Sequence, residues 1–227
     1  MSSTDQHRRQ QFFDYFRRRL STASREDVEL PDRLLLLSAC LDALAKHWHG
    51  TADRSEIPAA LRGDERLRRF LLKHGGHPAF ARVSAPMFRK AKGQEVGTFP
   101  FNEYKLNEMN TTRDWSHDPT FDELTGIVVE RDALVRWSYP GILYVDLRCA
   151  WVHNFVPENE DIIINDSDFL GRGEPYYRLV SPFDPAKPQV GRFLLMMPLS
   201  FLLATVDRAI HSFESEATTR GVLPFLE

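Results

Sequence analysis

Apolar residues recur at three- and four-residue steps along much of the chain, and the clearest runs predict helices. In residues 5–20, phenylalanines at this spacing alternate with arginines, which is the pattern of an amphipathic helix. A stronger run follows Pro31, a residue suited to a first helical position, and continues to residue 48. The pattern therefore predicts a mainly helical protein, with weaker helical segments at residues 64–74, 78–92, 119–137 and 198–217.

Residues 140–157 form the most apolar of these segments. Pro140 suits the start of a helix and Pro157 stops it, which leaves about 17 residues, or near 25 Å of helix. Apolar side chains occupy nearly the whole circumference of this helix. We therefore expect it to lie at the centre of a helical bundle, where any polar side chain needs a specific partner.

Two other segments lack a helical period. Residues 93–118 contain glycines, a proline and several asparagines, and they predict a long inserted loop. Residues 161–180 contain two β-favouring runs separated by glycines, and they predict a small β-hairpin. The expected fold class is thus an all-α helical bundle with a small β-hairpin and a long inserted loop, in a single domain over residues 1–227.

The overall charge is small, but its distribution along the chain is uneven. The 227 residues carry a net charge of −3, whereas residues 1–92 contain 18 lysines and arginines against 11 acidic residues. A basic half of this kind can contact phosphate backbones. The alternative is that arginines such as Arg66, Arg68 and Arg69 form solvated helix faces, as charge runs usually do. The sequence leaves both interpretations open.

Composition also excludes several classes of protein. No secretion signal precedes the first helix and no run of about 20 apolar residues is present, so we expect a soluble, cytoplasmic protein without a membrane partner. Cys40 and Cys149 lie in apolar helical contexts and predict free thiols. The histidine pairs His47/His49 and His74/His77 lack accompanying ligands, so no metal and no cofactor are expected.

The polar residues that need explaining in the apolar segment 140–157 are Arg148 and His153. An arginine can hold a phosphate with a planar fork of donors, and a histidine can move protons near neutral pH. In a chain of this composition, about one arginine–histidine pair with this spacing is expected by chance. A second pair, Arg69 and His74, has the same spacing, but its neighbouring arginines and following glycines predict exposure to solvent. The apolar context therefore distinguishes the first pair.

The segment Leu-Arg-Cys-Ala-Trp-Val-His-Asn at residues 147–154 resembles the signature of the HEPN superfamily, in which an arginine precedes a histidine by four to six intervening residues and asparagine often follows. Residues 37–44 and 66–72 also resemble the leading helices of some bacterial members. The resemblance implies a helical bundle that forms a homodimer. Two motif helices then meet over a groove that cleaves RNA without a metal.

The resemblance implies that His153 is the general base that takes the proton of a ribose 2′-hydroxyl, and that Arg148 stabilises the charge on the phosphorane. Asn154 would orient His153 or contact the RNA. Many active members carry a polar residue directly after the arginine, where this chain has Cys149. In a straight α-helix Arg148 and His153 would point about 140° apart, so the site requires two facing helices or a helix that loosens near His153.

The resemblance thus implies a cytoplasmic endoribonuclease of the kind that acts as a toxin or in antiviral defence, with an antitoxin or another regulatory partner. Two alternatives stay open. One is a non-catalytic HEPN-like dimeric scaffold, or a module that binds a nucleotide or a partner, in which Arg148 pairs with Asp146 or another acid and His153 is a satisfied interior histidine. The other is a helical protein that resembles the family by coincidence. Asp146 lies near the His153 stripe of the helix, so it is also a supporting candidate for the site.

Overall fold

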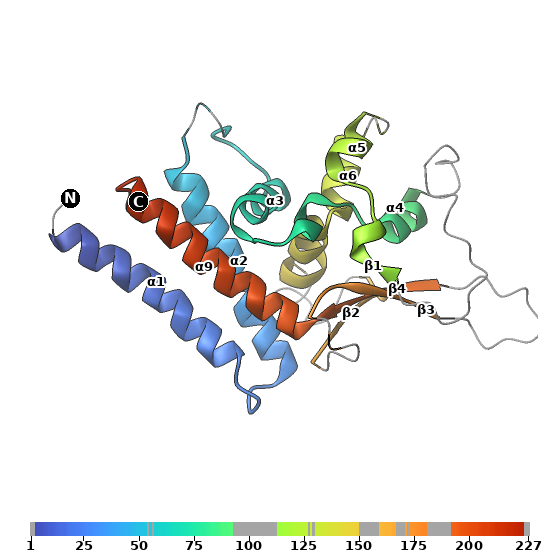
Figure 1. Cartoon of the computed structure of the whole chain (residues 1–227), viewed down its shortest axis with the longest axis horizontal. Helices are drawn as coiled ribbons and strands as arrows, with labels where there is room; N and C mark the ends of the chain where they lie inside the picture. The colour runs from blue at the N-terminus through green and yellow to red at the C-terminus, as the bar shows by residue number, and fades with distance from the viewer. Residues whose placement is uncertain are drawn as a thin grey trace, which may run out of the picture.

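Long helices form one half of the molecule. The computed structural model describes residues 3–53, 55, 57–92, 113–126, 128, 130–149, 159–166, 171, 173–180 and 192–224. Helices α1 (Ser3–Ala23), α2 (Leu30–Thr51) and α9 (Leu199–Thr219) pack side by side, and α3 (Gly63–His74) packs against α2 and α9 (Figure 1). All four helices lie where the hydrophobic period predicts them. The mainly helical character of the protein is therefore confirmed.

The main core lies between these helices because their apolar stripes face one another. Leu34, Leu37 and Leu44 of α2 are fully buried, as are Phe213 of α9 and Phe70 of α3. Pro31 occupies the first turn of α2, as its sequence position predicts. Burying one leucine or phenylalanine side chain contributes about 1.5–3 kcal/mol, so this cluster accounts for the close packing of the four helices.

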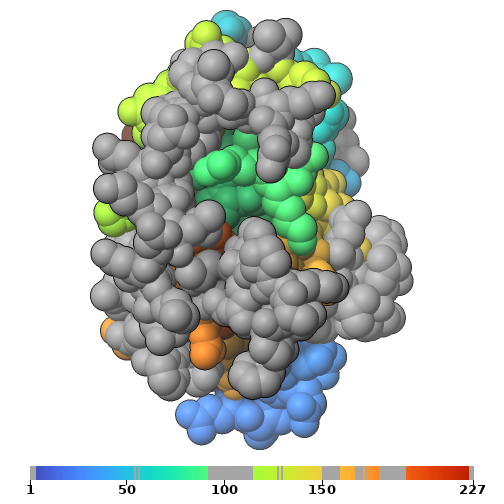
Figure 2. Space-filling model, turned by 90° about the vertical axis from the view of Figure 1, so that its right-hand side faces the viewer, coloured from blue at the N-terminus to red at the C-terminus, as the bar shows by residue number. Residues whose placement is uncertain are grey.

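Shorter elements replace two of the predicted helices. Residues 78–92 divide into a 3₁₀ helix, η1 (Pro78–Ala81), and α4 (Ala85–Lys92), while residues 119–137 divide into α5 (Phe121–Thr125) and α6 (Arg131–Trp137). A second, smaller hydrophobic cluster lies among these elements and contains Phe88, Phe121, Leu124 and Leu134. Figure 2 shows the end of the molecule opposite the two termini, where α4 (green) forms much of the described surface.

The predicted hairpin is wrong, because its two strands are not neighbours. Strands β2 (Ile162–Asn165) and β3 (Tyr176–Val180) both exist, but β4 (Arg192–Pro198) lies between them, antiparallel to β3 and parallel to β2. The apolar side chains Leu195, Met196 and Met197 are buried on both faces of β4. A strand buried on both faces belongs at the centre of a sheet, which explains why β4 separates the other two.

The prediction of a long inserted loop over residues 93–118 is also wrong, at the C-terminal end of that range. Residues 93–112 lie outside the described part of the chain, but the following residues form β1 (Arg113–Asp114), which pairs with β3, and the 3₁₀ helix η4 (Trp115–His117). The fold is therefore mainly helical with a four-stranded sheet, rather than all-α with a hairpin. Among the helices in the described ranges, none is both long enough and apolar enough to cross a membrane.

A buried polar network connects the sheet to the short helices. The hydroxyls of Tyr139 and Tyr177 donate hydrogen bonds of 2.8 and 2.6 Å to the same carboxylate oxygen of Asp118. The Tyr177 hydroxyl also lies 2.8 Å from the hydroxyl of Ser84. All four side chains are almost completely buried, and burial together with the Asp118 charge raises the pKa of both tyrosines well above 10. The network fixes the position of Tyr139, the first residue of α7.

Candidate functional site

The candidate arginine lies on a helix whose winding changes along its length. Helix α7 (Tyr139–Ile142) begins at a Ser138 cap and runs directly into the π-helix η5 (Leu143–Cys149), which carries Arg148. A Cβ atom on Gly141 would lie only 1.9 Å from the carbonyl oxygen of Val135. Only glycine therefore allows α7 to begin so close to the end of α6.

The apolar sequence predicts that η5 is enclosed on all sides, but the structure leaves part of this helix accessible to solvent. Leu143, Asp146 and Leu147 are buried, whereas Tyr144 and Arg148 are half-buried. The side chain of Arg148 is 29% exposed. The prediction of a wholly interior helix is therefore wrong over the residues described, and the arginine lies at the surface of the protein rather than in its core.

Arg148 shares its acidic partner with a second arginine. Its Nη2 atom lies 3.2 Å from one carboxylate oxygen of Asp42 on α2, and the other oxygen accepts a 3.1 Å hydrogen bond from Arg66 on α3. The Arg148 guanidinium also lies 5.7 Å from the Tyr144 ring centroid. Partial burial lowers the pKa of Arg148, but the Asp42 charge together with Cys149 and Tyr144 outweighs this effect, and the pKa rises above its ordinary value. Two cations thus share one carboxylate beside η5.

Among the ion pairs of the described residues, the supporting candidate Asp146 pairs with Arg136 and not with Arg148. Its buried carboxylate accepts hydrogen bonds of 2.8 and 3.1 Å from the two Nη atoms of Arg136, the last basic residue of α6. This forked pair joins α6 to η5. Asp146 therefore holds the helix that carries Arg148, and the acid that pairs with Arg148 is the half-buried Asp42.

The described part of the motif ends at Cys149. His153 and Asn154 lie outside the described residues. Cys149, the last residue of η5, is half-buried, and its sulfur lies 4.0 Å from Nη1 of Arg148. Both cysteines are free thiols, as predicted, and burial raises the pKa of Cys40 to about 12. Within the described ranges, no group of three or more histidine, cysteine, aspartate or glutamate side chains is arranged to hold a metal ion.

The second arginine and histidine pair of the sequence has a different environment from the predicted one. Arg69 is partly exposed, but His74 is only 2% exposed, so the prediction of solvent exposure is wrong for the histidine. The Nδ1 atom of His74 lies 2.9 Å from the Ser212 hydroxyl, and Nε2 lies 3.0 Å from a carboxylate oxygen of Glu216, both on α9. Burial lowers the pKa of His74 to about 4, against the opposing effect of Glu216. His74 is thus an interior histidine whose Nδ1 contacts the Ser212 hydroxyl, while Nε2 lies close to Glu216 without forming a hydrogen bond.

This burial predicts a pH-dependent loss of stability. Above pH 6.5, His74 is neutral in both the folded and the unfolded chain, whereas below it the unfolded chain binds a proton that the folded chain excludes. Lowering the pH from 7 to 5 should therefore reduce the free energy of unfolding by about 2 kcal/mol through this residue. Urea titration at both pH values measures the effect, and His74→Gln should abolish it.

The exposed His211, also on α9, provides the matched control for this measurement. His211→Gln should retain the wild-type difference between pH 7 and pH 5. At pH 5 most carboxylates are still ionised, so Glu216 contributes little to the comparison. A His74→Gln protein that loses as much stability as the wild type over this interval would show that the buried histidine is not the cause.

Two residues that lie beside Arg148 were not predicted as site residues from the sequence. Asp42 is the one charged residue within the apolar run of residues 34–45, so the argument that singled out Arg148 applies to it equally. Arg66 gave no such signal, because it lies among other arginines on an amphipathic helix. The sequence could therefore have supplied Asp42 as a candidate, but only the packing of α3 against α2 brings Arg66 to the same carboxylate.

Comparisons of the chain with protein-family models, with curated proteins and with solved structures found no match.

Proposed function

We propose that the protein is a metal-independent endoribonuclease of the HEPN type, which acts as a homodimer. His153 takes the proton of a ribose 2′-hydroxyl, and the 2′-oxygen attacks the adjacent phosphorus. Arg148 stabilises the negative charge that develops on the phosphoryl oxygens. The bond from phosphorus to the 5′-oxygen then breaks, and the 5′-oxygen leaves with a proton from water. The hydroxide that remains takes the proton from His153, which restores both the water and the base. The products carry a 2′,3′-cyclic phosphate and a 5′-hydroxyl.

The observation that carries the proposal is the placement of Arg148 at the surface, beside a carboxylate that it shares. A guanidinium sealed in the core could not reach a phosphate, whereas Arg148 is 29% exposed. Asp42 holds one edge of the guanidinium and orients it, but its single negative charge also serves Arg66. A positive charge therefore remains beside η5 that a phosphate could neutralise.

The winding of η5 also supports the proposal. In a π-helix each backbone amide bonds to the carbonyl five residues earlier, so residues five apart lie near one another on the same side. Arg148 is the last residue but one of this π-helical segment. Such segments are frequent at functional sites. The helix is π-helical as far as Cys149.

The test compares wild-type protein with His153→Ala on a single-stranded RNA in the presence of a chelator. The wild type should cleave the RNA and leave 2′,3′-cyclic phosphate ends, and His153→Ala should be slower by about 10²–10⁴-fold. His211→Ala is the matched control, because His211 is an exposed histidine on a separate helix. The same RNA with 2′-O-methyl groups throughout should resist cleavage, since the attacking hydroxyl is blocked.

Each alternative gives a different result. A folded dimer that leaves the RNA intact would overturn the nuclease and favour the non-catalytic scaffold, in which the ion pair of Arg148 with Asp42 is only structural. Cleavage that persists unchanged in His153→Ala would exclude the proposed base. A monomer by sedimentation, with no activity at any concentration, would favour a resemblance to the family by coincidence.

A further inference from the structure

Helix α3 presents a row of cations along its outer face. Arg66, Arg69 and Lys73 fall within about 60° of one another around the helix axis, and Arg62 directly precedes the first turn. We call these four residues, Arg62, Arg66, Arg69 and Lys73, the α3 stripe. The stripe extends along about 16 Å of the helix. The opposite face of α3 is buried against the core, so the stripe is fixed in position.

Three of the carboxylates that pair with the stripe also pair with cations outside it. Three acidic side chains, Asp42, Glu65 and Glu216, form ion pairs with seven lysine and arginine side chains, which are Arg66, Arg68, Arg69, Lys73, Arg131, Arg148 and Arg220. Within the stripe, Arg62 pairs with two further carboxylates, Asp64 and Asp132, so eight cations share five carboxylates in all. This face therefore has an excess of positive charge, although the whole chain has a net charge of −3.

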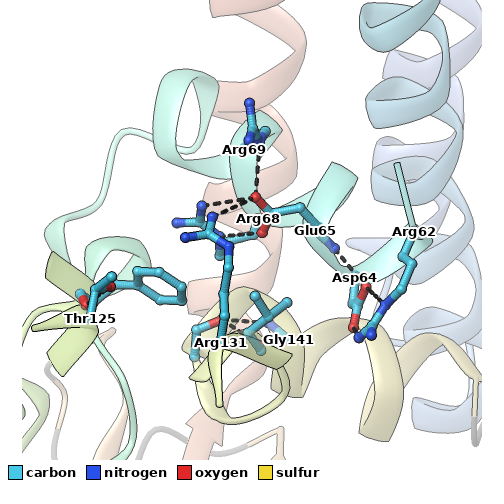
Figure 3. Close-up of polar contacts among 11 residues, drawn as sticks. Arg62, Asp64, Glu65, Arg68, Arg69, Thr125, Arg131 and Gly141 are labelled. Atoms are coloured by element: carbon cyan, nitrogen blue, oxygen red, sulfur yellow. Dashed lines mark hydrogen bonds and ion pairs between the residues drawn. The ribbon is translucent and has the colours of Figure 1, made fainter. Parts of the chain in front are cut away.

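Glu65 shows the excess most clearly. Arg68, Arg69 and Arg131 all converge on its carboxylate, at distances of 2.7, 2.9 and 3.2 Å (Figure 3). Burial alone would raise the pKa of Glu65, but the hydrogen bonds from Arg68 and Arg69 lower it to about 2. Arg68 is also fixed by the Phe121 ring, 4.2 Å from its guanidinium. One carboxylate thus holds three guanidinium groups in place, and two positive charges remain.

The stripe is continuous with the candidate site. Arg66 belongs to the stripe and shares Asp42 with Arg148, so one carboxylate lies between the two. Solvated charge runs are common on helices, but in such runs charges of opposite sign alternate, and the run need not adjoin a functional site. The face that carries the α3 stripe differs in both respects, because eight lysine and arginine side chains share five carboxylates there and the stripe meets the arginine proposed to act on phosphate.

We infer that the α3 stripe binds the phosphate backbone of a single-stranded RNA and directs the strand to Arg148. This inference rests on the proposed function, since it names the path that the substrate takes to that site. Guanidinium groups bind phosphates through paired hydrogen bonds, and the release of counterions from the RNA drives the association. The ion pairs with Asp42 and Glu65 hold the guanidinium groups in position before the strand arrives.

The test measures binding separately from cleavage. A fluorescently labelled 2′-O-methyl RNA of 20 nucleotides is titrated with the protein at several salt concentrations, and anisotropy gives the dissociation constant. In the variant Arg62→Gln/Arg66→Gln/Arg69→Gln, affinity should fall at least 10-fold, and the slope of log affinity against log salt should decrease by about 2. Circular dichroism and urea unfolding establish that the variant is folded.

The matched control removes the same charge from another face. Arg8, Arg18 and Arg25 are exposed residues in and just after α1, which α2 and α9 separate from α3. The variant Arg8→Gln/Arg18→Gln/Arg25→Gln should bind the RNA as the wild type does. Equal losses in both variants would show that net charge alone matters and would overturn the inference, as would a stripe variant that binds as tightly as the wild type.

Binding and cleavage can fail independently. If the wild type binds the RNA through the stripe but cleaves no RNA, the stripe stands and the nuclease proposal fails. If the wild type cleaves RNA and the stripe variant retains both full cleavage and full binding, the nuclease proposal stands and the stripe fails.

Discussion

Replacement of Arg148 by alanine is expected to slow RNA cleavage by about 10²–10³-fold, the effect of removing one donor that stabilises transition-state charge. The fold should tolerate the change. Arg148 is partly exposed, and Asp42 keeps Arg66 as a partner when Arg148 is removed. The free energy of unfolding should therefore change by less than about 1 kcal/mol. Single-turnover cleavage assays and urea unfolding on the same preparation measure the two effects.

Arg148→Lys separates charge from geometry in this experiment. A lysine keeps the positive charge but lacks the planar fork, so its activity should fall between those of the wild type and Arg148→Ala. Arg17→Ala is the control, because Arg17 is a half-buried, ion-paired arginine on the distant helix α1. Wild-type cleavage by Arg148→Ala would contradict the proposed role, and a large loss of stability would instead assign Arg148 a structural one.

Replacement of Asp118 by alanine is expected to reduce the free energy of unfolding by about 4 kcal/mol. The change removes two short hydrogen bonds from Tyr139 and Tyr177 to a charged acceptor, each of which contributes about 1.5–3 kcal/mol. Both hydroxyls are buried, so water does not replace the lost acceptor without cost. Urea unfolding at pH 7 measures the loss, with circular dichroism as the readout.

Single tyrosine substitutions should give smaller losses. Tyr139→Phe and Tyr177→Phe each remove one hydroxyl and leave Asp118 with the other, so each should cost roughly half as much as Asp118→Ala. Combining Asp118→Ala with Tyr177→Phe should add little to the loss from Asp118→Ala alone, because the partners act on one network. Strictly additive losses, or a loss below about 1 kcal/mol for Asp118→Ala, would contradict the network.

The long helices could be predicted from the sequence because each carries its own period of apolar residues. α1, α2, α3 and α9 all bury a stripe that is visible without knowledge of the neighbouring elements. The order of the strands could not be predicted in this way. β2 and β3 have β-favouring residues, but the apolar run of β4 directly precedes a helix and merges with its pattern. Its central place depends on tertiary pairing.

Only part of the candidate site could be predicted. Arg148 stands out because an apolar helix surrounds it in the sequence, but that same pattern predicted burial where the structure has a half-exposed face. The pattern assumes an α-helix, whereas the π-helical winding of η5 turns its side chains by a different amount per residue. The partners Asp42 and Arg66 lie 106 and 82 residues earlier in the chain, so local spacing contains no information about them.

The π-helical winding of η5 has a consequence for variation at this site. A wide turn holds one residue more than an α-helical turn, so deletion of a single residue within it could restore regular winding. A residue lost from a regular α-helix instead rotates everything that follows by about 100°. Because the wide turn takes up the extra residue, Arg148 would keep its direction towards α2 after the first kind of deletion and lose it after a deletion within α7. Changes of chain length are thus better tolerated within η5 than in the helix that precedes it.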